Sequence, residues 1–282
     1  MHLHGVFTAL VTPFAQGAID RESFASLCKR QLDAGVAGLV PCGTTGETPA
    51  LAEEEWTDLV STAVRVSDGS VPVIAGCGSN STARTVATIT RAKNLGADAA
   101  LVVFPYYNKP NPAGLQAHVE AACRCGLPIV LYHVPGRTGQ RLSLDQLTEL
   151  CKIEGVVALK EATGDVALGQ QLLDRTDRAI LSGDDFTFAA LMSMGGAGTI
   201  SVLSNLAPAM TVAWARAADD GDVKTLRELR SRLLPVVDYL FADTNPAPAK
   251  AALAAMGLCS NEMRLPLAPG APPHAQLIAG LH

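Results

Sequence analysis

The chain has 282 residues, of which 48% are hydrophobic and 17% are charged, and its formal net charge is −5. This composition predicts one large globular unit with a sizeable core, and the acidic balance excludes a basic surface for nucleic acid or an anionic membrane. The opening residues lack a basic segment followed by a long apolar run, and no apolar run reaches about 18 residues, so we expect neither a secretory signal nor a membrane span.

The seven cysteines are an odd number and lie scattered through predicted helices and strands. Cys123 and Cys125 are too close in sequence for an ordinary disulfide, and no CxxC pair is present to bind zinc. We therefore expect a reduced, cytoplasmic protein without a metal site.

A unit of strand followed by helix repeats along the chain about every 30 residues. Glycines that mark predicted helix ends stand at positions 35, 69, 96, 126 and 155, and each is followed by a strand-like apolar run. Such a repeat implies parallel strands with right-handed crossovers. The predicted strands cover residues 6–14, 36–43, 71–78, 98–106, 127–134, 156–162, 179–184 and 198–204.

The clearest helix in this series reads "SLDQLTELCK". Ser143 is a suitable N-cap, and Gln146 three residues later completes a capping box. Leu144, Leu147 and Leu150 repeat with helical spacing and form one apolar stripe. The stretch therefore predicts a helix that begins after Ser143.

Eight strands, each followed by a helix, predict a (β/α)8 TIM barrel. The competing doubly wound sheet is disfavoured because the nearest stretch to a dinucleotide fingerprint, "GCGSNS", lacks the last glycine of G-x-G-x-x-G. Three more helical stretches follow, near 207–219, 222–241 and 246–257. We expect a catalytic barrel over residues 1–220 and a C-terminal helical extension over 221–282 that packs on it.

Barrel enzymes carry their chemistry where strands end and βα loops begin, and polar residues collect at those positions in this chain. Three of the four tyrosines lie there. The candidates, in chain order, are Thr44, Thr45 and Glu47; Tyr106 and Tyr107; Tyr132, His133 and Arg137; and Lys160 and Glu161.

Lys160 is the unexpected residue, because it interrupts the apolar strand "VVALKEA". An amine attacks a ketone only when it is neutral, and at pH 7 only about one free lysine in 2,500 is neutral. Moving such a pKa to about 7 takes roughly 4–5 kcal/mol, which desolvation in an apolar barrel can supply. The alternative is that Lys160 pairs with a buried carboxylate as a structural bridge.

Three hydroxyl side chains from separate strands, those of Thr44, Tyr107 and Tyr132, are suited to passing protons around such a lysine. Arg137 follows in a loop, where its guanidinium could hold a substrate carboxylate. Each has an ordinary alternative: Tyr132 could fill core, Arg137 could be a surface residue, and "GTTGE" could be a turn with a helix cap. All of these residues are expected at the same end of the barrel, which favours a functional site over the ordinary alternatives.

The chain resembles the dihydrodipicolinate synthase family, within the pyruvate-dependent class I aldolases that include N-acetylneuraminate lyase. The resemblance runs essentially end to end. The motifs that carry it are "GTTGE", "PYYNKP", "YHVPGRTG", "ALKEATGD", "LSGDD" and "NPAPAK".

This resemblance implies a role for each matching residue. Lys160 forms an imine with pyruvate, and Tyr132 positions and protonates at the imine carbon. Thr44, Tyr132 and Tyr107 form a proton relay, with Tyr107 reaching into a neighbouring subunit's site. The substrate-binding residues implied are Thr45 for the pyruvate carboxylate, Arg137 for the second substrate's carboxylate, and Gly183 and Ile200 through their main chain.

The resemblance also implies the reaction. Pyruvate condenses with L-aspartate 4-semialdehyde to give 4-hydroxy-tetrahydrodipicolinate, on the route to diaminopimelate and lysine, with no metal or organic cofactor. A homotetramer built as a dimer of dimers is implied as well. Arg137 and the first threonine of "GTTGE", where sialic-acid lyases commonly have serine, favour this substrate over the aldehyde of those lyases. A sugar-acid aldolase is the runner-up, and a catalytically silent keto-acid-binding barrel is a third reading.

Two departures from the family pattern concern regulation and the site rim. His133 stands where many relatives carry asparagine, and we interpret it as a tolerated substitution at the rim. Lysine-inhibited relatives bind lysine at a subunit interface. The corresponding positions here, which would form a vestigial effector site, are Asn80, Tyr106, Glu53, Trp56 and Arg84. Because a cation at position 84 repels the amine of lysine, we expect weak inhibition or none.

Overall fold

The structure, a computed structural model that describes residues 1 and 3–281, is a closed barrel of eight parallel strands. Hydrogen-bonded neighbours follow the order β4-β1-β10-β9-β8-β7-β6-β5, and a parallel bridge between Leu39 and Val73 joins the two ends of the sheet. The barrel strands are β1 (Gly5–Ala9), β4 (Gly38–Val40), β5 (Ile74–Gly76), β6 (Ala99–Val103), β7 (Ile129–His133), β8 (Val156–Glu161), β9 (Ala179–Ser182) and β10 (Gly198–Ser201).

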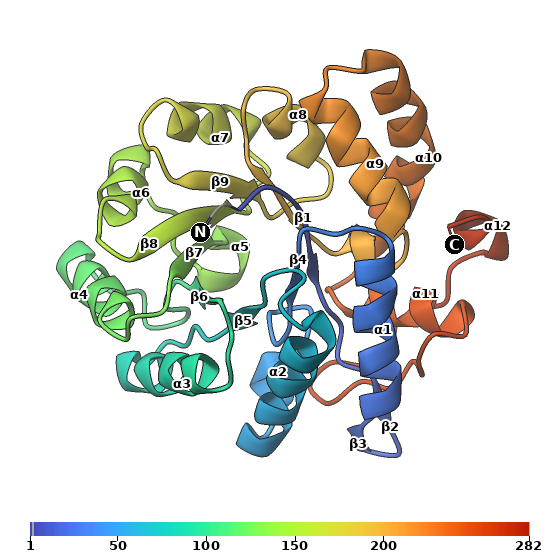
Figure 1. The fold of residues 1–282 in the computed structure, drawn as a ribbon, viewed down its shortest axis with the longest axis horizontal. Helices are drawn as coiled ribbons and strands as arrows, with labels where there is room; N and C mark the ends of the chain where they lie inside the picture. The colour runs from blue at the N-terminus through green and yellow to red at the C-terminus, as the bar shows by residue number, and fades with distance from the viewer. Residues whose placement is uncertain (2, 282) are drawn as a thin grey trace.

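Helices surround this barrel, one after each strand (Figure 1). They are α1 (Arg21–Asp33), α2 (Glu53–Ser67), α3 (Thr82–Asn94), α4 (Pro112–Cys123), α6 (Leu144–Cys151), α7 (Val166–Leu173), α8 (Phe188–Met192) and α9 (Pro208–Asp219). Short elements in the connecting loops are β2 (Phe14–Ala15), β3 (Ala18–Ile19), η1 (Thr48–Ala50), α5 (Pro135–Thr138) and η2 (Leu203–Asn205). The predicted TIM barrel is confirmed.

The local signals read from the sequence act as expected. The five glycines predicted to end helices have φ between 72° and 97°, the left-handed conformation that stops a helix. The Ser143 hydroxyl accepts a hydrogen bond from the Gln146 backbone N–H, and the Gln146 side chain accepts one from the Ser143 backbone N–H. The predicted capping box of α6 is therefore confirmed.

The first predicted strand, residues 6–14, is too long. β1 ends at Ala9, and Phe14 belongs to a separate two-stranded hairpin, in which β2 pairs with β3. Pro13 carries no N–H and cannot continue a strand ladder, and the Thr12 hydroxyl instead donates to the carbonyl of Gly46 at 2.7 Å. The residues after β1 thus turn away to meet the loop that follows β4.

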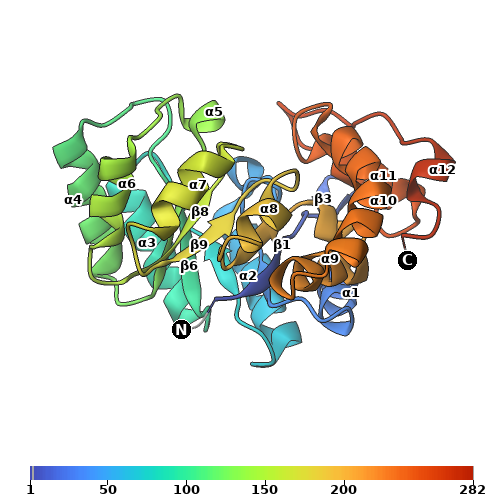
Figure 2. The ribbon, with the colours of Figure 1, turned by 90° about the horizontal axis from the view of Figure 1, so that it is seen from above.

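Three further helices extend the chain after residue 220: α10 (Val223–Phe241), α11 (Ala247–Ala255) and α12 (Ala275–Ile278). They lie together on one side of the barrel, next to α9 and α1 (Figures 1 and 2). The helical extension is confirmed, whereas the division at residue 220 stays a prediction. No helix within the described residues has the length and apolar character needed to cross a membrane.

The core has two parts, one inside the barrel and one between the strands and the helices. Inward-facing side chains such as Phe7, Leu101, Tyr132 and Ile200 form the inner group. The larger outer group joins helices to strands and includes Trp214, whose ring packs edge-on against Phe188 at 4.7 Å between centroids. The site residues on the strands are therefore held by packing on both faces.

We predict that Gly76→Ala destabilises the fold by about 3 kcal/mol, because overpacking a closed core displaces backbone. A Cβ at Gly76 would lie 2.0 Å from the carbonyl oxygen of Cys42 and 2.8 Å from the backbone nitrogen of Gly43, where only backbone could yield. The matched control is Gly136→Ala, since a Cβ there meets no atom within 4 Å. Chemical denaturation of both variants measures the difference, and equal midpoints would contradict the prediction.

Candidate active site

The Lys160 amine is buried inside the barrel near the end of β8. The residue is 6% exposed, and strand pairing sets it opposite Tyr132 on β7. Its Nζ lies 4.3 Å from the centroid of the Tyr132 ring. Within the described part of the chain no carboxylate forms an ion pair with this amine. The alternative of a structural bridge at Lys160 therefore does not describe this structure.

Tyr132 connects this lysine to a cavity of about 580 Å³. Thr44 from the loop after β4, Tyr132 from β7 and Arg137 from α5, which follows β7, all line it, so three predicted site residues meet there. Lys160 is not among the lining residues and lies against Tyr132 instead. Tyr132 is thus the residue that both lines the cavity and contacts the amine.

Thr45 and Arg137 are joined by a residue that the sequence analysis did not select. The Asn245 side-chain amide donates to the Thr45 hydroxyl at 3.0 Å, and the Arg137 guanidinium donates to the Asn245 carbonyl at 3.2 Å. Asn245 begins the stretch "NPAPAK", which was recognised as a motif but given no role. Contacts across 200 residues of sequence cannot be read from local patterns.

Gly183 and Ile200 contribute shape. Gly183 follows β9 and lies against Lys160: a Cβ there would fall 2.7 Å from Lys160 Cε and 2.6 Å from the Cβ of Ala162. Ile200 is 1% exposed and belongs to the packed interior of the barrel. Gly183 therefore limits the space around the lysine side chain, and Ile200 fills part of the barrel interior.

Tyr107 is the one predicted catalytic residue that this chain does not bring to the others. It is 89% exposed, has a left-handed backbone with φ 71°, and does not line the cavity. The adjacent Tyr106 does line it. A role for Tyr107 in the site of a neighbouring subunit stays a prediction.

His133 was expected at the rim, and that prediction is wrong. The side chain is fully buried, and its Nε2 accepts a hydrogen bond from the backbone N–H of Leu142 at 3.2 Å. In the neutral ring the proton is then on Nδ1, which lies 3.6 Å from the Glu161 carboxylate. That carboxylate accepts the backbone N–H of Thr163 at 2.8 Å, whereas His133 Nδ1 has no hydrogen-bond partner among the described residues. His133 therefore holds the loop after β7 through Leu142, and Glu161 holds the loop after β8 through Thr163.

Asp185 holds the next two loops together and was not selected from the sequence either. Its Oδ2 accepts hydrogen bonds from the backbone N–H groups of Val202 and Leu203, at 2.9 and 2.8 Å. Burial raises the pKa of this carboxyl above its usual value, against the opposing effect of these hydrogen bonds. The loops after β9 and β10 are thereby fixed to each other.

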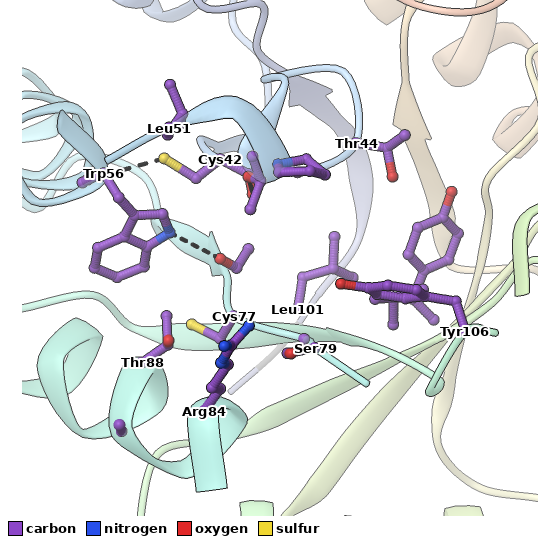
Figure 3. A pocket seen from close by; sticks show the side chains of 18 of the residues that line it. Cys42, Thr44, Leu51, Trp56, Cys77, Ser79, Arg84, Thr88, Leu101 and Tyr106 are labelled. Carbon is purple, nitrogen blue, oxygen red and sulfur yellow. Dashed lines mark hydrogen bonds between the residues drawn. The ribbon is translucent and has the colours of Figure 1, made fainter. Parts of the chain in front are cut away.

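The far end of the cavity contains most of the predicted effector residues. Figure 3 shows Trp56 and Arg84 at one end and Thr44 and Tyr106 at the other. Arg91, also in the lining, pairs with Glu53, and its guanidinium carbon lies 5.9 Å from the centre of the Trp56 ring. Asn80 is not in the lining. No cluster of three or more potential metal ligands occurs among the residues described.

The model of the dihydrodipicolinate synthetase family matches residues 2–278. The chain belongs to this family. A 4-hydroxy-tetrahydrodipicolinate synthase of Nitratidesulfovibrio vulgaris (strain DP4) is 45% identical over 273 residues, which cover 95% of this chain and 94% of the relative. The resemblance seen in the sequence is confirmed.

Solved structures of the family agree with this membership. The crystal structure of dihydrodipicolinate synthase from Thermotoga maritima is 40% identical with a TM-score of 0.92, covering 100% of this chain and 97% of that one. The chloride-inhibited dihydrodipicolinate synthase of Acinetobacter baumannii, crystallised with pyruvate, is 40% identical with a TM-score of 0.93. That match covers 99% of this chain and 96% of the other.

Because Gly183 lies against the lysine side chain, we predict that Gly183→Ala lowers activity by about 100-fold, as expected when a reacting group is displaced by about 1 Å. The added methyl would overlap Lys160 Cε and displace the amine. Measuring kcat/KM beside a far-ultraviolet circular dichroism spectrum separates this displacement from unfolding. A folded variant with the activity of the wild type would contradict it.

Proposed function

We propose that this chain is a 4-hydroxy-tetrahydrodipicolinate synthase that condenses pyruvate with L-aspartate 4-semialdehyde. The observation that carries the proposal is the buried Lys160 amine, which forms no ion pair with a carboxylate of the described residues and lies against Tyr132, a residue that lines the cavity. An amine that is not committed to an ion pair is available for a covalent bond to a carbonyl carbon. The names of the relatives and the pyruvate complex of the Acinetobacter baumannii protein support the substrate.

The first half of the reaction activates pyruvate. The Lys160 amine adds to the ketone carbon and water leaves, which produces an imine. The protonated imine withdraws electrons from the methyl carbon, so this carbon loses a proton and an enamine forms. The Tyr132 ring centre lies 4.3 Å from Lys160 Nζ, and Thr44 lines the same cavity as Tyr132, which supports a role for these two hydroxyls in carrying the protons. Tyr107 of a neighbouring subunit would complete the relay to solvent.

The second half forms the ring. The enamine carbon attacks the aldehyde of the semialdehyde, and the new alkoxide takes up a proton. The amino group of that substrate then attacks the imine carbon, closes the ring and releases the Lys160 amine. Arg137, which is exposed at the mouth of the cavity, is suited to binding the carboxylate of this second substrate.

The remaining substrate contacts follow from the same geometry. Thr45 is 3% exposed and held by Asn245, which fits a role in binding the pyruvate carboxylate. Gly183 and Ile200 would shape the space around the imine. No organic cofactor or metal ion is needed in this mechanism, since the imine itself is the electron sink. A cytoplasmic homotetramer, in which Tyr107 completes a neighbour's site, is part of the proposal.

Substrate choice is tested by product formation from pyruvate with L-aspartate 4-semialdehyde, beside N-acetylmannosamine and sugar-derived aldehydes, for wild type and Lys160→Ala. We expect turnover with the semialdehyde alone and at least about a 1,000-fold loss in the variant, because the covalent route is removed. Turnover with a sugar aldehyde would instead assign a sugar-acid aldolase. Folded wild type without turnover would favour the silent barrel.

We further propose that lysine inhibits this enzyme weakly or not at all. The exposed Arg84 and the half-buried Arg91 bring two guanidinium groups to the far end of the cavity, and the Glu53 carboxylate is already paired with Arg91. The side-chain ammonium of lysine would therefore meet like charge. A lysine titration should leave the rate unchanged in the micromolar range, and Arg84→Glu should lower the inhibitory concentration. Micromolar inhibition of the wild type would contradict this proposal.

A further inference from the structure

A second buried lysine lies next to the site and plays a different part. Lys250 in α11 is fully buried, and its Nζ donates a hydrogen bond to Glu47 Oε1 at 2.7 Å. Glu47 is 2% exposed and is the last residue of "GTTGE", the loop that also contains Thr44 and Thr45. This charged pair joins residues 203 positions apart in sequence. It connects α11 to the loop that is proposed to bind pyruvate.

Arg264 satisfies the other oxygen of the same carboxylate. Its backbone N–H donates to Glu47 Oε2 at 3.2 Å, and its guanidinium donates to the carbonyl of Ala50 at 2.9 Å. The Phe14 ring lies close to both cations, 4.3 Å from Lys250 Nζ and 4.4 Å from the Arg264 guanidinium carbon. These contacts hold Glu47 from the C-terminal extension and from the hairpin after β1 at once.

The loop needs such support because its backbone is irregular. Glu47 has φ 54°, in the left-handed region that non-glycine residues seldom adopt, and Cys42 before the loop has φ 56°. Conformations of this kind persist where the surroundings fix them. Asn245, which precedes α11, binds Thr45 in the same loop. Residues of the C-terminal extension therefore donate hydrogen bonds to this loop at both Thr45 and Glu47.

A buried ion pair is a poor way to gain stability, since removing two charges from water offsets most of their attraction. Its better-supported use is to fix one arrangement among several. Here the arrangement concerns the hydroxyls of Thr44 and Thr45, which stand three and two residues before Glu47. We propose that the Glu47–Lys250 pair, completed by the backbone of Arg264, positions the Thr44–Thr45 loop for binding the carboxylate of pyruvate.

This inference deepens the proposed function and rests on it. Glu47 and Lys250 are positioning residues, since they act through Thr44 and Thr45 and do not themselves meet the substrate. Removing either charge should weaken pyruvate binding more than it weakens use of the aldehyde. A pair with a purely structural role would lower the melting temperature and leave pyruvate binding by the folded enzyme unchanged.

Reductive trapping with sodium borohydride measures this binding without the second substrate. The full-length protein is incubated with increasing pyruvate, the imine is reduced, and mass spectrometry gives the concentration for half-maximal labelling. The variants are Lys250→Met, Glu47→Gln and the two combined. The matched control is Glu55→Gln, because the Glu55 carboxylate binds the Arg264 guanidinium at 2.5 Å but does not touch the loop carboxylate.

We expect each single variant to raise the half-maximal pyruvate concentration by about tenfold or more, as expected when a binding group is misplaced. KM for the semialdehyde should rise by a smaller factor. The combined variant should bind pyruvate better than either single one, because neither charge is left buried alone. Glu55→Gln should lower the melting temperature and leave the pyruvate concentration unchanged.

Folded single variants that label at the pyruvate concentration of the wild type would overturn the inference. Should Lys250→Met fail to fold, Glu47→Gln carries the same test, since it keeps the size of the side chain and loses only the charge and one acceptor. Wild type that traps no pyruvate at all would contradict the proposed function itself. Failure of the inference is recognised separately, by a wild type that traps pyruvate and single variants that match it.

Discussion

The pairing register of β7 and β8 is the constraint on which the rest of the site depends. It sets Lys160 opposite Tyr132 and brings the amine to 4.3 Å from the ring centre. Because side chains alternate along a strand, a slip of one residue would turn Lys160 out of the barrel toward the helices. Buried leucines at 131 and 159, paired across the same two strands, oppose such a slip. Packing of ordinary apolar residues thus determines where the Lys160 amine lies.

The two buried lysines, Lys160 and Lys250, have different surroundings, and these surroundings suit them to different roles. Lys250 is bound by Glu47 and lies near an aromatic ring, so its charge is matched by a carboxylate. Burial lowers the pKa of Lys250, while the hydrogen bond and charge of Glu47 act in the opposite direction. Lys160 also lies near an aromatic ring but has no carboxylate in contact among the described residues. The first arrangement fixes a loop, and the second leaves an amine available for chemistry.

Much of this molecule could be predicted from its sequence, because the signals are local. The glycines with positive φ, the capping box at Ser143 and the apolar runs of the strands each depend on a few neighbouring residues, and the structure agrees with them. The features that were predicted wrongly or not at all involve contacts between segments that are distant in sequence. β1 ends early because Thr12 meets Gly46, and His133 is buried because Leu142 folds back on it. Asn245 and Lys250 gain their roles only when the C-terminal extension meets the loop after β4.

We propose that the Lys160 amine, and no other buried lysine, forms the covalent bond to pyruvate. Peptide mapping after incubation with pyruvate and sodium borohydride tests it most directly, since the reduced adduct stays on the lysine that formed the imine. We expect one adduct per chain, on the peptide that contains Lys160, with the peptide that contains Lys250 unlabelled. An adduct on Lys250, or labelling spread over exposed lysines with Lys160 unmodified, would contradict it.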